Sequence, residues 1–189
     1  MAETAAGLCT RALVMLGAQP IASLDDAVME ARVCRNLYPG VRDALVSAHP
    51  WSFATRQARL PELTDAPPAD FAHAFQLPAD FLRALSAGTD GRGAGLRHRI
   101  VQRRLHADAA TVVLTYIARP LESDLPPFFA QALVTRLAAE LALPITESTS
   151  RAEMLGELAN REVTRAQRVE AQQSPRPRVD AFPLLDARS

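Results

Sequence analysis

The chain has 189 residues, of which 48% are hydrophobic and 22% are charged, so it is long enough to bury a core without a disulfide or metal, and its composition excludes a disordered or collagen-like chain. The formal net charge is zero, which argues against a protein that wraps nucleic acid nonspecifically, because that task requires a large basic excess. All 21 basic residues are arginines, which a GC-rich genome explains most simply.

The first residues show no basic region followed by an apolar run, and no stretch of about 18 apolar residues runs without interruption. We therefore expect no membrane span, and residence in the cytoplasm at least until something assembles. Cys9 and Cys34 lack the spacing of a metal motif and fall on the apolar stripes of two expected helices, so we expect both to be packed thiols.

Two helices are expected in the first fifty residues. The first has apolar residues at helical spacing over 5–16 and should end at Gly17. The second should begin between Ser23 and Asp26, whose oxygens can cap free amides, and should run to about His49.

The second helix contains Pro39, but its apolar residues stay in helical phase on both sides of this proline. We therefore expect one helix kinked at Pro39 rather than two unrelated helices. The residues that follow leave the helix, because a residue before proline favours extended conformations. Tyr38, Trp51 and Phe53 are expected to form one buried cluster.

The middle of the chain is expected to hold the strands. Residues 60–80 are rich in proline and predict an irregular, packed connection. Beyond them the apolar period approaches two, and residues 112–117 are typical of a strand covered on both faces. Residues 97–101 and 103–105 are candidate partner strands, with the glycine-rich run 88–95 as a flexible tip.

Helical periodicity returns after the prolines at 126–127, which suit the first turn of a helix, and Pro144 is expected to close this helix. Ser150 and Glu153 have the spacing of a capping box, which predicts the start of a last helix.

The chain after about residue 172 contains three prolines, which exclude a helix, together with Phe182, Leu184 and Leu185. An extended arm that needs a partner to bury these side chains is one interpretation, and a disordered end is the other. On the first interpretation these three residues dock on a partner surface.

No motif for chemistry is found. The sequence contains no phosphate-binding loop, HExxH, paired CxxC or GxSxG motif, and its four histidines lack metal-ligand spacing. Asp25 and Asp26 resemble a carboxylate pair, but helix capping explains them. We therefore expect no enzyme and no catalytic, cofactor-binding or metal-binding residues.

One segment has a clear electrostatic signature, because it is basic and contains no acid. It contains His98 and five arginines, namely Arg92, Arg97, Arg99, Arg103 and Arg104. We expect a protruding hairpin on which Arg97 and Arg99 share a face and the arginines serve assembly rather than folding. A DNA backbone, a protein partner and a merely solvated loop face remain open.

These elements predict an α+β fold, mainly α, in which a helical bundle carries an inserted small antiparallel β-sheet or hairpin and an extended C-terminal arm. The helical core should comprise residues 3–58 and 126–172, the β-rich insertion about 75–120, and the arm 173–189.

The order of several short motifs is similar to a known family. The motifs are Leu-Gly-Ala-Gln-Pro-Ile (16–21), Ser-Leu-Asp-Asp (23–26), Glu-Ala-Arg (30–32), Leu-Tyr-Pro-Gly-Val-Arg-Asp-Ala-Leu (37–45), His-Pro-Trp-Ser-Phe-Ala-Thr-Arg (49–56), Phe-Gln-Leu-Pro-Ala-Asp-Phe-Leu-Arg (75–83) and Leu-Ala-Ala-Glu-Leu-Ala (137–142). Over residues 4–170 the chain resembles the tail tubular protein A family of short-tailed bacteriophages, also called head-to-tail adaptors or gatekeepers. The block from Arg42 to Ala54 is the most specific part.

The resemblance implies a structural protein of the virion neck, within residues 1–172, that forms a dodecameric ring. It implies the portal protein above the ring, the tail nozzle below it, and genomic double-stranded DNA in the channel without sequence specificity. On this resemblance Phe182, Leu184 and Leu185 would dock on the portal or on a neighbouring subunit, and the protein would lie in the host cytoplasm during assembly. The resemblance brings no catalytic residues. The alternative is a DNA-binding or packaging-associated protein that uses the Arg92 to Arg104 segment.

Overall fold

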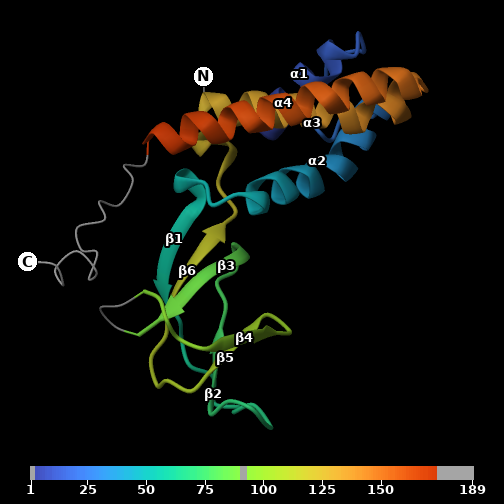
Figure 1. Cartoon of the computed structure of the whole chain (residues 1–189). Helices are drawn as coiled ribbons and strands as arrows, with labels where there is room; N and C mark the ends of the chain where they lie inside the picture. The colour runs from blue at the N-terminus through green and yellow to red at the C-terminus, as the bar shows by residue number, and fades with distance from the viewer. Residues whose placement is uncertain (1–2, 90–92, 174–189) are drawn as a thin grey trace, which may run out of the picture.

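The computed structural model describes residues 3–89 and 93–173, in which four α-helices and two small antiparallel sheets form an α+β fold that is mainly α. The helices are α1 (Ala5–Met15), α2 (Met29–Ala48), α3 (Pro127–Thr146) and α4 (Thr149–Gln173). The strands are β1 (Thr55–Arg59), β2 (His73–Gln76), β3 (Phe81–Gly88), β4 (His98–Val101), β5 (Arg104–Ala107) and β6 (Val113–Ala118). The helices form one layer, here called the helical body, and the strands form a β part beside it (Figure 1).

The helix at the centre of the helical body is α3, which packs against α1, α2 and α4. Leu133, Leu137 and Leu141 in α3 are fully buried. By length and composition α3 is apolar enough to cross a membrane, but 56% of the apolar window is buried inside the molecule. Because three helices cover it, its apolar surface is explained by the core of the helical body.

Two features of the N-terminal helices are confirmed. The helix α1 ends at Met15, and Gly17 follows it with a φ of +71°, a left-handed conformation that favours glycine. The helix α2 continues through Pro39 without a break. The periodicity of the apolar residues therefore predicted correctly that a single helix spans this proline.

The predicted start of α2 is wrong by three residues, since the helix begins at Met29. The carboxylate of Asp26 accepts hydrogen bonds from the backbone amides of Ala22 (2.9 Å) and Ser23 (3.1 Å), which precede it. Asp26 therefore closes a turn before the helix instead of capping the helix.

The predictions at the junction of α3 and α4 are also wrong. The helix α3 does not close at Pro144 but extends to Thr146, and Glu147 follows with a φ of 54°. The residue that caps α4 is Ser148, whose Oγ accepts from the amide of Arg151 at 3.3 Å, rather than Ser150. A proline in the last turn still leaves enough carbonyls paired for the helix to continue.

The strands form two three-stranded antiparallel sheets with the orders β1-β6-β3 and β2-β5-β4. The strand predicted at 112–117 is present as β6, but the segments predicted as its partners, now β4 and β5, pair with each other in the second sheet. Side chains from both sheets share one apolar core, which includes Phe75, Leu105 and Leu114. The β part is therefore a small two-sheet unit with a core of its own.

The β part also begins earlier than expected. The strand β1 occupies Thr55–Arg59, which falls inside the range predicted to be helical, and β2 falls inside the connection predicted to be irregular. Burial along β1 shows no clear apolar alternation, because Arg56, Gln57 and Arg59 are all exposed. Its pairing with β6 is what makes it a strand.

Candidate interaction surfaces

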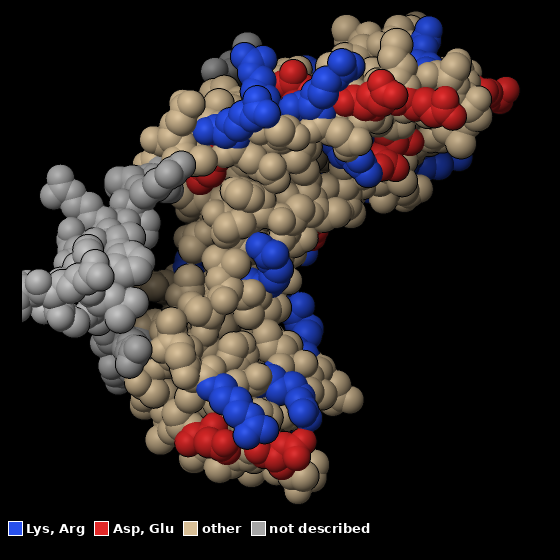
Figure 2. Space-filling view, in the orientation of Figure 1, with Lys and Arg blue, Asp and Glu red and all other residues tan. Residues whose placement is uncertain are grey.

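The arginine-rich segment forms a hairpin of β4 and β5 at the end of the β part farthest from the helical body (Figure 1). A hairpin is thus present as predicted, but it does not protrude on its own, because β5 also pairs with β2 in the second sheet. Arg92 lies outside the described residues. Basic side chains at this end lie beside acidic ones (Figure 2). The hairpin surface therefore has mixed charge, although its own strands contain no acid.

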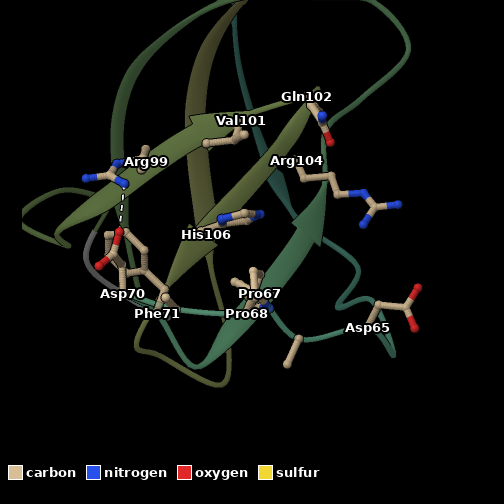
Figure 3. Close-up of a pocket in the computed structure, with 12 residues that line it drawn as sticks. Asp65, Pro67, Pro68, Asp70, Phe71, Arg99, Val101, Gln102, Arg104 and His106 are labelled. Carbon is tan, nitrogen blue, oxygen red and sulfur yellow. Dashed lines mark hydrogen bonds and ion pairs between the residues drawn. The ribbon is translucent and has the colours of Figure 1, made fainter.

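Arg97 and Arg99 lie on one face of the hairpin, as their spacing of two residues predicts. Both side chains pack over the ring of Phe71. Their guanidinium carbons lie 5.4 and 5.9 Å from the centroid of the Phe71 ring, which is 8% exposed. Arg99 also forms an ion pair with Asp70 at 2.9 Å (Figure 3). Both arginines therefore have contacts within the chain, and their service in assembly rather than folding stays a prediction.

A cavity of about 350 Å³ lies between this hairpin and the proline-rich segment before β2. His106 lies centrally in it, and the Arg104 guanidinium points away from Asp70 (Figure 3). Asp65 and Asp70 supply two carboxylates to the same lining. Two acids beside the guanidinium groups oppose the binding of a phosphate, so the cavity is poorly suited to a DNA backbone.

Arg103 also has a partner within the chain, because its guanidinium donates to the carbonyl of Pro78 at 3.4 Å. With Gln102 it forms the two-residue turn between β4 and β5, and both residues have positive φ angles of 48° and 61°. This is the geometry of a type I′ turn, which normally favours Asn and Gly.

An apolar groove that the sequence did not reveal runs along the helical body between α2, α3 and α4. Two cavities of about 510 and 560 Å³ form it, and both are lined by Asn36, Leu37 and Glu140. The remaining lining is mostly apolar and includes Val33, Val41, Leu45, Leu143, Pro144 and Val163. Volumes of this size are typical of surfaces that receive a ligand or a partner side chain.

At the end of the helical body remote from the β part, α1 and α3 end and α2 and α4 begin (Figure 1). Six residues at or near these helix ends have exposed apolar side chains. The guanidinium of Arg151 in α4 donates to the carbonyl of Leu16 at 2.9 Å, which ties these helix ends together. The side chains, here called the apolar tip, are Val14, Met15, Val28, Met29, Leu143 and Met154. A cluster of this kind marks a contact surface more often than isolated apolar residues do.

A charged network joins α2 to the segment that follows β6. Asp43 accepts hydrogen bonds from Arg119 (2.6 Å) and from Arg42 (3.0 Å). The carboxylate of Glu122 accepts from Arg42 and from the Tyr38 hydroxyl, the latter at 3.0 Å. Five side chains thus hold the helical body and the β part in a fixed relation.

Hydrogen bonds decide the protonation of this network. Burial alone would raise the pKa of Asp43, but hydrogen bonds from Arg119 and Arg42 outweigh it and lower the pKa. In the same way, hydrogen bonds lower the pKa of Glu122 against the effect of burial. Burial and the negative charge of Glu122 raise the pKa of Tyr38. The network is therefore a structural set of ion pairs at neutral pH.

Trp51 anchors the helical core, as predicted. It is fully buried, and its indole nitrogen donates to the carbonyl of Leu45 at 3.2 Å. Its ring centroid lies 5.1 Å from that of Phe129 and 6.0 Å from that of Phe53. Tyr38 belongs to the same buried cluster.

Cys9 and Cys34 are free, buried and close enough to interact, which agrees with the prediction of packed thiols. The hydrogen bond to Cys34 and burial both raise the pKa of Cys9, so this thiol stays protonated and is a poor nucleophile. Among the described residues no group of three or more His, Cys, Asp or Glu side chains is placed to hold a metal.

Phe182, Leu184 and Leu185, the predicted docking residues of the C-terminal arm, lie outside the described residues. The groove and the apolar tip were missed because each combines residues that are distant in sequence. Exposed apolar residues at helix ends, such as Val14 and Met15, were the available signal, but only the fold shows that these ends meet.

A scan against models of known protein families finds no match to this chain, and a search of curated proteins also finds none.

Proposed function

We propose that this protein is a structural component of a bacteriophage virion, a head-to-tail adaptor that forms a ring between the portal and the tail nozzle. Genomic DNA would pass through the channel of the ring without sequence-specific contacts. The sequence resemblance over residues 4–170 suggests this role, and the uncovered apolar surface of the helical body is the structural observation that supports it.

The groove between α2, α3 and α4 and the apolar tip leave apolar side chains in contact with water on two adjoining regions, and Leu143 belongs to both. Covering such a surface with another protein contributes free energy in proportion to the apolar area buried. A subunit that repeats around a ring has neighbours available to cover it.

The alternative, a DNA-binding or packaging-associated protein, depends on the Arg92 to Arg104 segment. Arg97, Arg99 and Arg103 each have a contact within the chain, and Asp70 neutralises Arg99 directly. A DNA-binding surface instead needs several arginines free to contact phosphates. The hairpin therefore favours the adaptor over this alternative.

The test is the state of the purified full chain in solution. We expect native mass spectrometry and electron microscopy to show a closed ring of many copies, or a ring that forms when the protein is concentrated. The DNA alternative instead predicts a monomer that binds short duplexes with a steep dependence on salt. A monomer at all concentrations with such binding would overturn the proposal.

A further inference from the structure

The outward face of α4 carries acidic residues in its N-terminal half and basic residues in its C-terminal half. Glu153 and Glu157 form the acidic half, and Arg161, Arg165 and Arg168 form the basic half; all five are exposed. Most of these positions recur every four residues, so they lie on one stripe of the helix. The two charges are visibly separated along the helix (Figure 2).

The helix dipole does not account for this separation. Its effect falls off within the first and last turns. The first turn of α4 contains no acidic residue and its last turn no basic residue. The charged residues lie in the middle of the helix, where the dipole contributes little.

Ion pairs within the chain do not account for it either. Among the described residues Glu157 and Arg161 form no ion pair although they are four residues apart, and the nearest carboxylate to Arg165 is Glu162 at 3.9 Å. The residues of the basic half surround a shallow hollow of about 340 Å³. Guanidinium groups around a hollow can receive a carboxylate in a bidentate manner.

We propose that the acidic half of α4 on one copy of this protein contacts the basic half of α4 on the next copy. In both halves the charged residues lie about one helical turn apart. Glu153 and Glu157 of one helix can therefore face Arg161 and Arg165 of another helix in register. The inference rests on the proposed function, because in a ring each subunit contacts two neighbours through two different surfaces. The acidic half serves one neighbour and the basic half the other.

The charges would set which surfaces meet, and the apolar groove would supply buried area. Exposed ion pairs contribute little affinity, but complementary charge fixes register and speeds association. Asn160 lines both the hollow and the groove, so one neighbour can cover both. Duplex DNA is a poorer fit for the stripe, because Glu153 and Glu157 would repel it.

The test reverses the charges in two separate full-length variants. One carries Arg161→Glu, Arg165→Glu and Arg168→Glu, and the other carries Glu153→Arg and Glu157→Arg. Both residue types favour helix, so the fold of α4 should persist, and circular dichroism checks this. We expect each variant alone to assemble roughly tenfold more weakly than the natural chain at low salt, as measured by analytical ultracentrifugation.

Two controls separate the charge pattern from simple damage. In an equimolar mixture the two variants can alternate around the assembly, which restores every acid–base contact between neighbours. A single chain that carries all five reversals also restores every contact between neighbouring copies, with the two charges exchanged. Both should assemble like the natural chain. Asp25 and Arg35, which lie outside α4, form an exposed ion pair with a distance of 3.4 Å between them. Reversing both of these charges should leave assembly unchanged.

The outcomes are distinct. Unchanged assembly of either separate variant, or a mixture that stays unassembled, would overturn this inference while leaving the ring intact. Failure of the natural chain to assemble at all would instead overturn the proposed function. Loss of duplex DNA binding in the variant without the three arginines, with assembly unchanged, would assign the basic half to DNA.

Discussion

Trp51 is the residue on which the packing of the helical body depends most. Its side chain is fully buried, contacts Phe53 and Phe129, and pairs its indole nitrogen with Leu45. We expect Trp51→Ala to lower the free energy of unfolding by about 3–5 kcal/mol, because it leaves a cavity and an unpaired carbonyl. Urea unfolding at neutral pH measures this.

A matched control for this prediction is Leu121→Ala, since Leu121 is 65% exposed and should cost less than about 0.5 kcal/mol. A loss below about 1 kcal/mol for Trp51→Ala would show that the aromatic cluster is not the anchor of the core.

Asp43 gives the fold a dependence on pH. Its pKa is lowered in the folded chain from an ordinary value of 3.8, because its hydrogen bonds from Arg119 and Arg42 outweigh burial. A carboxylate with a lowered pKa stabilises the fold above its unfolded pKa, and this contribution is lost as the pH falls through the folded value. We expect Asp43→Asn to be less stable than the natural chain at pH 7 and nearly equal to it well below pH 3.8.

Stability curves of both proteins between neutral and acid pH test this prediction. Asp25→Asn serves as the control, because the side chain of Asp25 is 85% exposed and its pair with Arg35 is long. A difference between Asp43→Asn and the natural chain that stays constant at every pH would contradict the assignment.

At the scale of elements, the turn between β4 and β5 is strained. Gln102 and Arg103 adopt positive φ angles, which cost a residue with a side chain about 1–2 kcal/mol. We expect Gln102→Asn with Arg103→Gly to raise the free energy of unfolding by about 1–2 kcal/mol, since Asn-Gly suits a type I′ turn.

Gln102→Ala with Arg103→Ala removes the same side chains but keeps the strain, so it should bring no gain. Both double variants lose the contact of Arg103 with Pro78, so equal stability of the two would show that the turn is not strained.

The elements that the sequence predicts well are those whose own apolar period decides them. The apolar period across Pro39 correctly predicted that α2 is one helix, and Gly17 correctly predicted the end of α1. The alternation at 112–117 correctly predicted the strand β6. The sequence did not reveal β1, because its residues are exposed and only pairing with β6 makes it extended. The contacts of Phe71 with Arg97 and Arg99 were likewise inaccessible, since they join segments separated in sequence.

For the whole molecule, the described residues already contain two buried apolar cores, one in the helical body and one in the β part. In each of these cores the largest side chains, such as Trp51 and Phe75, are fully buried by other described residues. We therefore expect a chain truncated after Gln173 to melt within a few degrees of the full chain while assembling or binding the portal less well. Phe182, Leu184 and Leu185 are the apolar residues lost, and burying them on a partner would contribute about 1.5–3 kcal/mol each before the cost of ordering.

Thermal melting and analytical ultracentrifugation of both chains separate the two effects. A truncated chain that unfolds would show that the segment belongs to the fold. One that completes particles as well as the full chain would show that it has no part in docking.

We propose that this chain is an adaptor between portal and tail. The most direct test of this proposal is to mix the purified protein with the portal ring of the same phage and to measure the mass of the product, followed by electron microscopy. We expect a single complex in which many copies form a second ring coaxial with the portal. A portal that keeps its own mass at every concentration of this protein would contradict it.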